Sequence, residues 1–199
     1  MTSGETDKTC CWEGPAMDGK MDRNVRVCPS PLGEIVISSD GEHVTGVWFL
    51  DPKGASKGLE TAQNGDDPAL KRAENWLKMY FLGLDPGPIP PVLTHGTPFE
   101  ERVWARLESI PRGSVVTYGE IARAVAGEMG VARMSAQAVG GAVGRNPISI
   151  FIPCHRVVGS DGRLTGYAGG LDRKRALLRI EGVPLDGEKD KVILEKTGR

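Results

Sequence analysis

The sequence contains no long apolar run. None of its stretches approaches the roughly 20 apolar residues that a membrane-spanning helix requires. Residues 1–23 also lack the apolar segment that forms the centre of a secretory signal. We therefore predict a cytoplasmic protein with no membrane partner.

Cysteines are few and form no regular framework. The four are Cys10, Cys11, Cys28 and Cys154. Their irregular spacing is typical of free thiols in a reducing compartment. A zinc site that combines the first three with His43 and His95 would lack the short Cys-Cys or His-His spacing of such sites. We therefore expect neither a bound metal nor another cofactor.

Charge of one sign is not in excess either, because the net charge of the 199 residues is only −1. The distribution is uneven, however, at −5 over residues 1–96 and +4 over residues 97–185. Eleven of the twelve cations in the second stretch are arginine, whose flat guanidinium group matches phosphate. This positive half is compatible with nucleic-acid binding and equally with an ordinary solvated surface.

The first half of the chain predicts an α/β domain over residues 23–93, after a mobile N-terminal tail over residues 1–22. Turn-forming residues separate three strand-like runs, NVRVC, GEIVISS and HVTGVWFLD, which indicates an antiparallel meander. A polar loop follows over residues 52–66. Apolar residues at helical spacing then predict a helix from Pro68.

The second half, residues 94–185, predicts a mainly helical domain, and residues 186–199 form a C-terminal tail. Thr97 and Thr117 are each followed three positions later by a glutamate. This is the pattern of a capping box, so a helix should begin after each threonine. Ser135 caps a third helix in MSAQAVGGAVGRNP.

The third helix is unusually slim. Gly140, Gly141 and Gly144 each cost about 1 kcal/mol relative to alanine in a helix interior. Small residues suit the close approach of another backbone, either a packed helix or a groove of nucleic acid. Two short capped helices in succession resemble a helix-turn-helix. The GSDG turn at residues 159–162 predicts a hairpin beside them, and hence a winged arrangement.

Cys154 lies in the apolar segment ISIFIPCHRVV, directly before His155. Burial should raise the pKa of its thiol, so a reactive role requires a base. Neighbours on an extended segment point to opposite faces, so we expect a bridging water or a local kink near Pro153 to link the thiol to His155. Glu181 on the last helix is a candidate to orient the imidazole. The alternatives are a buried structural cysteine and the Cys–His pair of a thiol hydrolase.

The segment IPCHRVVGSDGRLTGYAGGLDRKRALLRIEG, with GRNP and TYGEIA upstream, resembles the O6-alkylguanine-DNA alkyltransferases. The Pro-Cys-His-Arg core is highly specific to that family. The resemblance is strong over about residues 97–184 and weaker over residues 25–93, where the family has a ribonuclease-H-like α/β domain. It implies a protein that repairs O6-alkylguanine, and also O4-alkylthymine, in double-stranded DNA. A cysteine accepts the alkyl group once and is consumed. We expect a monomer, because the sequence shows no self-association surface.

The resemblance also assigns roles to residues. Cys154 would attack the alkyl carbon, with His155 as base through a water and Glu181 behind it. Asn146 would link the helix-turn-helix to this relay. Tyr118 would act as the proton donor near N3 of the leaving guanine. The remaining residues implied to form the pocket are Val157, Tyr167, Ala168 and Lys174, although a plain surface role for Lys174 stays open.

By the same resemblance, the slim helix would enter the minor groove of DNA. The residues implied to contact DNA are Arg133, Gln137, Ala138, Gly140, Gly141 and Arg145. Gln137 stands where many relatives have an intercalating arginine. Asp40 stands near His43 where zinc-binding relatives would have a cysteine, which again predicts no metal. A winged-helix DNA-binding protein without catalysis, or an alkylation-damage sensor, remains the alternative.

Overall fold

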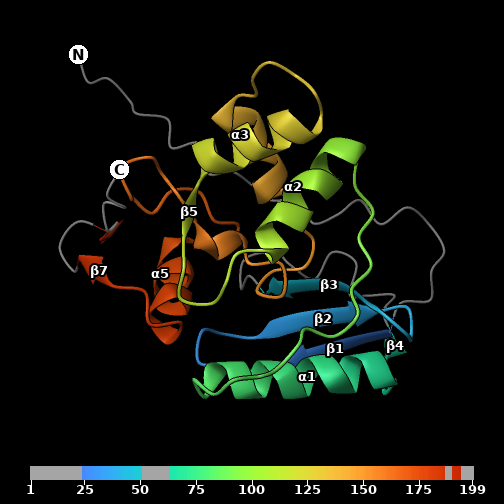
Figure 1. Ribbon diagram of the computed structural model, residues 1–199. Helices are drawn as coiled ribbons and strands as arrows, with labels where there is room; N and C mark the ends of the chain where they lie inside the picture. Colours follow the sequence, from blue (N-terminus) through green and yellow to red (C-terminus); the bar gives the residue numbers. More distant parts are fainter. Residues whose placement is uncertain (1–23, 51–62, 187–189, 194–199) are drawn as a thin grey trace, which may run out of the picture.

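The protein is described by a computed structural model over residues 24–50, 63–186 and 190–193 (Figure 1). The predicted N-terminal tail lies outside these residues. The strands are β1 (Asn24–Cys28), β2 (Ile35–Ser39), β3 (Val44–Phe49), β4 (Gln63–Asn64), β5 (Val116–Thr117), β6 (Val157–Val158), β7 (Leu185–Asp186) and β8 (Lys191–Val192). The helices are α1 (Pro68–Phe81), α2 (Pro98–Glu108), α3 (Tyr118–Glu128), α4 (Ala136–Gly144) and α5 (Leu171–Ile180), with a 3₁₀ turn at Cys154–Arg156.

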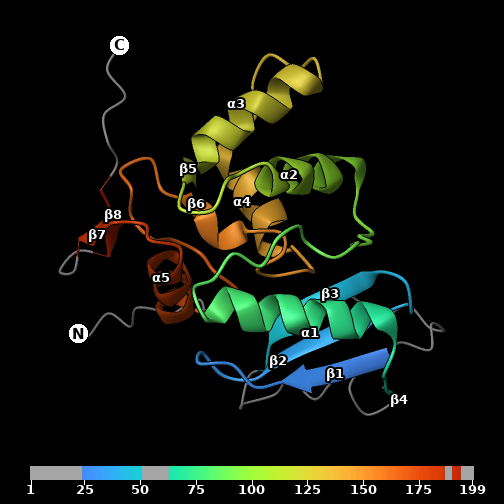
Figure 2. The same cartoon turned by 60° about the horizontal axis from the view of Figure 1, so that its bottom comes forward.

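The predicted meander and its helix are confirmed. Strands β1, β2 and β3 pair antiparallel in chain order, and α1 packs along one face of their sheet (Figure 2). Asp67 caps α1 by accepting a hydrogen bond from the backbone N–H of Leu70 at 2.8 Å. The helical spacing of the apolar residues places Leu70, Ala73, Leu77 and Tyr80 in the core.

Strand β4 was not predicted, because it lies within the expected polar loop. Its two residues pair with β1 in parallel, so the sheet order is β3-β2-β1-β4. A strand this short carries no alternation of apolar and polar residues that would reveal it in the sequence. It depends on the unpaired edge of β1 instead.

The helical half also begins its helices where the sequence predicted. Both capping boxes form, with Thr97 and Glu100 at the start of α2 and Thr117 and Glu120 at the start of α3. Ser135 caps α4 through the backbone N–H of Ala138 at 3.0 Å. Helices α2, α3 and α4 pack together, and in both views they lie beyond the β3 edge of the sheet (Figures 1 and 2).

The predicted hairpin after Cys154 takes a different form. The turn exists, because Gly159 N–H donates to Arg163 O at 2.9 Å. However, β6 pairs in parallel with β5, and Arg163 bridges to Lys191 of β8. Pairing with distant segments therefore replaces the ladder between the two arms of the turn. Lys191, which the prediction assigned to the C-terminal tail, supplies one of these partners.

The two halves of the chain share one hydrophobic core. Ile148 forms a parallel bridge to Val47 at the free edge of β3, so the helical half extends the sheet. Phe151 meets the ring of Trp76 on α1 edge to face, with centroids 4.8 Å apart. The boundaries at residues 23–93 and 94–185 stay a prediction, since this packing joins the segments on either side of them.

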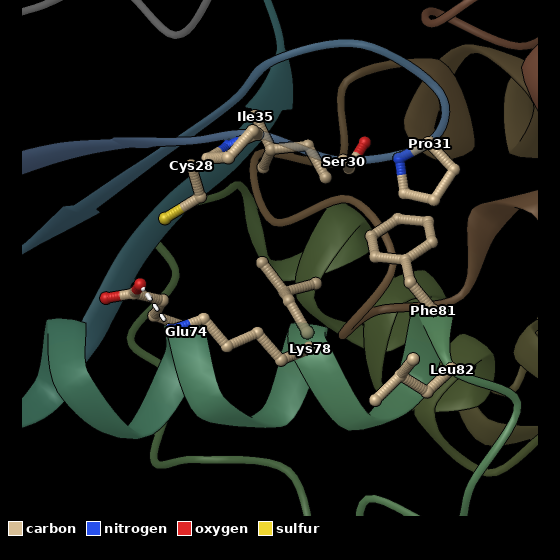
Figure 3. Close-up of a pocket in the computed structure, with 10 residues that line it drawn as sticks. Cys28, Ser30, Pro31, Ile35, Glu74, Lys78, Phe81 and Leu82 are labelled. Atoms are coloured by element: carbon tan, nitrogen blue, oxygen red, sulfur yellow. Dashed lines mark ion pairs between the residues drawn. The ribbon is translucent and has the colours of Figure 1, made fainter.

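An apolar cavity of about 550 Å³ lies between α1 and the turn that follows β1 (Figure 3). Its lining includes Cys28, Ile35 and Phe81, and the ion pair between Glu74 and Lys78 borders it. Burial raises the pKa of the Cys28 thiol.

Among the described residues, no helix is long and apolar enough to cross a membrane.

Candidate active site and nucleic-acid interface

The apolar segment that carries Cys154 is not an extended strand, and the expectation that it would be one was wrong. After Ile148 the chain turns through Ile150, whose φ is +73°, and then forms the 3₁₀ turn Cys154–Arg156. A positive φ is costly for a β-branched residue and persists only where packing enforces it. Ile150 is almost completely buried, which supplies that packing. The kink expected near Pro153 is therefore a full turn.

The thiol of Cys154 is buried in a polar surrounding. Burial raises its pKa, while Asn146, Lys174 and Ser149 act in the opposite direction. Asn146 follows Arg145, the C-cap residue of α4, and holds the turn. Its Nδ2 donates to Ile152 O at 2.8 Å, and its Oδ1 accepts from Ile148 N–H at 3.0 Å. The structure thus places Asn146 between the helix-turn-helix and the cysteine.

His155 and Glu181 form the predicted pair. His155 Nε2 lies 2.8 Å from Glu181 Oε1, and both side chains have no exposed surface. Glu181 is positioned as the C-cap residue of α5. Burial lowers the pKa of His155, and the hydrogen bond that His155 donates to Glu181 partly offsets this effect. His155 Nδ1 is buried without a hydrogen-bond partner in the described part of the chain, so this nitrogen is free to serve the thiol.

Two residues that the sequence did not assign also bind Glu181. Arg156 donates from Nε to Oε2 at 2.8 Å and from a terminal nitrogen to Oε1 at 2.9 Å. The Tyr80 hydroxyl donates to Oε1 at 2.8 Å. Burial raises the pKa of Glu181, but the hydrogen bonds from His155 and Arg156 outweigh it and hold that pKa far below its ordinary value. Glu181 is therefore an ionised carboxylate at neutral pH.

Lys174 is completely buried, so its surface alternative was wrong. Its Nζ donates to Val157 O at 2.6 Å and to Thr165 O at 2.7 Å, and lies 3.4 Å from Gly166 O. Burial lowers its pKa to about 8, and the nearby Cys154 acts in the opposite direction. Lys174 fixes the loop over residues 165–166 against β6.

The other predicted pocket residues surround the same loop. Tyr118, at the start of α3, donates from its hydroxyl to Thr165 O at 3.2 Å. The hydroxyl of Tyr167 is buried near Ser149 and Cys154 without a hydrogen bond of ordinary geometry to any described residue. Val157 offers its carbonyl to Lys174, and Ala168 is exposed. The structure thus brings Cys154, Tyr118 and Tyr167 together. Ala168 makes no hydrogen bond to another described residue.

The slim helix α4 turns its small residues outward. Val139, Ala142 and Val143 form its buried face, while Gln137 and Ala138 are exposed. A Cβ at Gly144 would meet nothing within 4 Å, and one at Gly140 would only touch the ring of Tyr118. Tight packing of another helix therefore does not explain these glycines. The alternative, an approaching partner outside the protein, remains.

The two flanking arginines differ in their surroundings. Arg145 forms an ion pair with Glu100 at 2.5 Å, although its side chain remains 60% exposed. Arg133 is exposed in the segment before α4, within the part of the chain that the structure describes. Arg133 thus forms no ion pair with the described residues, whereas Arg145 is paired with Glu100 of α2.

These features define a class of protein: a helix-turn-helix half that carries a buried cysteine with its own imidazole–carboxylate pair. Comparison with known proteins gives the particular family. The protein family described as "6-O-methylguanine DNA methyltransferase, DNA binding domain" matches residues 98–183 of this chain. The methylated-DNA–protein-cysteine methyltransferase of Haemophilus influenzae is 40% identical over 157 residues, which are 78% of this chain and 84% of that protein. The chain belongs to this family.

Solved structures agree with this assignment. The crystal structure of the Mycobacterium tuberculosis O6-methylguanine methyltransferase superposes with a TM-score of 0.67 at 37% identity, covering 82% of this chain and 96% of the other. A structure of the same organism's protein in complex with DNA gives a TM-score of 0.65 at 37% identity, covering 79% and 92% of the two chains. The fold predicted from the sequence, a meander with a helix followed by a helical DNA-binding half, is confirmed.

Proposed function

We propose that this chain is a methylated-DNA–protein-cysteine S-methyltransferase, which transfers the alkyl group of O6-alkylguanine in double-stranded DNA to its own Cys154. One observation carries the assignment of residues. Cys154 shares a 3₁₀ turn with His155, whose Nε2 is held by an ionised glutamate with no exposed side-chain surface. A structural cysteine would not need such a pair, and the family relationship supplies the substrate.

The chemistry follows from this arrangement. His155 Nδ1 accepts the thiol proton, through a water as the resemblance implies, and Glu181 stabilises the resulting imidazolium. The thiolate attacks the alkyl carbon, so a sulfur–carbon bond forms while the carbon–O6 bond breaks and its electron pair returns to guanine. Tyr118 lowers the cost of that charge by donating a hydrogen bond toward N3. The guanine finally takes up one proton, which balances the proton lost by the thiol.

The same arrangement accounts for a single turnover. The product is a thioether, which has no labile ester that water could attack. Burial keeps the resting thiol protonated and so protects it from stray oxidation. O4-alkylthymine, which presents an alkyl group on a comparable ring oxygen, is a second substrate in this proposal.

The reactive atom lies inside a base stack, so the nucleotide must be extruded into the pocket. In this proposal α4 enters the minor groove with its slim exposed face, with Ala138, Gly140 and Gly141 close to the DNA backbone. Gln137 reaches toward the orphaned base. Arg133 and Arg145 contact phosphates on either side of the helix. The protein acts as a monomer, and a cytoplasmic location remains a prediction.

An intact mass measurement tests the assignment. Incubation with O6-benzylguanine or a methylated duplex should add one alkyl group, and peptide mapping should place it on Cys154. The Cys154→Ala variant should gain no mass while still binding duplex DNA. Binding of DNA without an adduct on the wild type would favour a damage sensor or regulator. Turnover of esters or amides would favour a thiol hydrolase.

A further inference from the structure

The Tyr80 hydroxyl joins the relay from the other half of the chain. It lies on the last turn of α1, 101 residues before Glu181, and donates to Glu181 Oε1 at 2.8 Å. Tyr80 is among the largest fully buried side chains. It also lies outside residues 98–183, the part that matches the family's DNA-binding domain. The C-terminal end of α1 approaches α5 in both views of the fold (Figures 1 and 2).

Three donors converge on the same carboxylate oxygen. Glu181 Oε1 accepts hydrogen bonds from Tyr80, from Arg156 at 2.9 Å and from His155 Nε2 at 2.8 Å. The second oxygen binds Arg156 Nε and faces the N–H of Gly113. Hydrogen bonds to one oxygen compete for its electron density. Each further donor therefore weakens the hydrogen bond between this oxygen and the imidazole. The competition is strong here, since the pair is shielded from water.

We propose that Tyr80 is a positioning residue for the relay, whose hydroxyl limits how strongly Glu181 supports a protonated His155. The inference rests on the proposed function, in which His155 takes the thiol proton. Arg156 keeps Glu181 oriented through two hydrogen bonds, whether or not Tyr80 is present. The hydroxyl therefore tunes the proton affinity of the pair more than it fixes its geometry.

The other ionisable groups around the pair stay in place when the hydroxyl is removed. They come from the 3₁₀ turn, from α5, from the loop before α5 and from the segment after α2: Cys154, Arg156, Lys174, Tyr167 and Arg112. Arg112 lies over the Tyr80 ring, with its guanidinium carbon 5.4 Å from the ring centroid. This contact, and the stacking of the ring on Trp76 at 5.3 Å, involve only the ring. Tyr80→Phe thus removes one donor and leaves the packing intact.

The pH dependence of Cys154 alkylation tests this inference. The rate with O6-benzylguanine should fall at low pH as His155 becomes protonated and can no longer accept the thiol proton. In Tyr80→Phe, Glu181 has more electron density for the imidazolium. The midpoint of this acid limb should therefore move up by about half to one pH unit. An unchanged midpoint, or one that moves down, would overturn the inference.

A matched control separates tuning from simple loss of stability. Thr45→Val also deletes one buried hydroxyl, which bonds to Ser38 at 3.0 Å within the sheet and has no link to Glu181. It should leave the midpoint unchanged. If Tyr80→Phe slowed the reaction equally at every pH and left the midpoint in place, the inference would be wrong.

NMR titration of the His155 ring nitrogens measures the protonation midpoint of His155 without alkyl transfer. Its midpoint should shift upward in Tyr80→Phe, and no shift would overturn the inference. A wild-type protein that O6-benzylguanine or methylated DNA fails to alkylate would instead refute the proposed function. The two failures are thereby distinguishable.

Discussion

At the scale of residues, the site is held together by buried polar groups that satisfy one another. Glu181 has no exposed side-chain surface and binds His155, Arg156 and Tyr80. Among the described residues, the partners of the buried Lys174 are backbone carbonyl groups. Removing one member of such a set leaves its partners buried and unpaired, which costs more than the bond itself. These residues therefore support the fold as well as the chemistry.

We expect Lys174→Met to lower the free energy of unfolding by about 2–4 kcal/mol, because the methionine leaves the carbonyls of Val157 and Thr165 without a donor. Urea denaturation at pH 7 measures this free energy of unfolding. Lys78→Met is the matched control: Lys78 is 64% exposed in its pair with Glu74, so the change should be within about 0.5 kcal/mol. Equal effects of the two substitutions would contradict the role assigned to Lys174.

The sequence identified some of these residues and not others, for physical reasons. The Pro-Cys-His-Arg motif and its resemblance pointed to Cys154 and His155, and Glu181 fell on a predicted helix face. Tyr80 left no local signal, because its partner is 101 residues away. Arg156 stood within the motif, but nothing in the sequence showed that its charge is used inside the protein.

At the scale of elements, α4 combines low intrinsic stability with an open outer face. Its interior glycines disfavour the helix, and its buried face is limited to Val139, Ala142 and Val143. Trp104 compensates in part by donating from its indole nitrogen to Ala142 O at 2.9 Å. The exposed glycines leave room for a partner that the protein itself does not provide.

Gly144→Ala should raise the free energy of unfolding by about 0.5–1 kcal/mol, because alanine favours the helix and its Cβ meets nothing in the protein. It should also weaken binding to duplex DNA, if the groove occupies that space. Gly127→Ala in α3 is the control, since its Cβ likewise meets nothing within 4 Å. It should bring a similar stabilisation with unchanged DNA affinity. Equal affinities for the two variants would argue against α4 as the inserted helix.

Gln137→Arg should increase affinity for duplex containing O6-methylguanine, because the added cation neutralises phosphate charge near the flipped base. The slope of log affinity against log salt should also steepen by about one. Fluorescence anisotropy at several salt concentrations measures both. Affinity that stays the same or falls would refute the position given to Gln137.

Helix starts were predictable, whereas several strand pairings were not. A capping box such as Thr117 with Glu120 is a local arrangement, complete within four residues of the sequence. The pairing of β5 with β6, and that of β4 with β1, depend on segments far apart in the chain. The turn at Cys154 depends on the burial of Ile150, which only the assembled core provides.

At the scale of the whole molecule, the two halves form one packed unit. The core runs from the sheet and α1 into the helical half, and Arg173 of α5 also donates to Leu32 O at 2.9 Å in the turn after β1. The relay itself crosses this junction through Tyr80. The N-terminal half is therefore part of the site and not only a support beside it.

The stability of the molecule should fall as the pH decreases from 7.5 to 4. Burial lowers the pKa of His155 below its ordinary value of 6.5, so the unfolded chain takes up this proton first, and stability is lost as the pH falls through 6.5. Hydrogen bonds from His155 and Arg156 outweigh burial and hold the pKa of Glu181 below 4.5, so a further loss follows below pH 4.5.

Urea denaturation across this pH range measures the effect. Glu181→Gln should be less stable at pH 7 and should lack the part of the loss that begins below pH 4.5. Stability that stays constant or rises toward pH 5 would contradict the neutral imidazole assigned to His155.

The most direct test of the account is the number of lesions that one molecule repairs. The purified protein is mixed with an excess of duplex containing O6-methylguanine, and both restored guanine and protein mass are followed to completion. The account predicts one restored guanine and one methyl group on Cys154 for each active molecule. Repair of many lesions per molecule, or restored guanine without a methyl group on the protein, would contradict it.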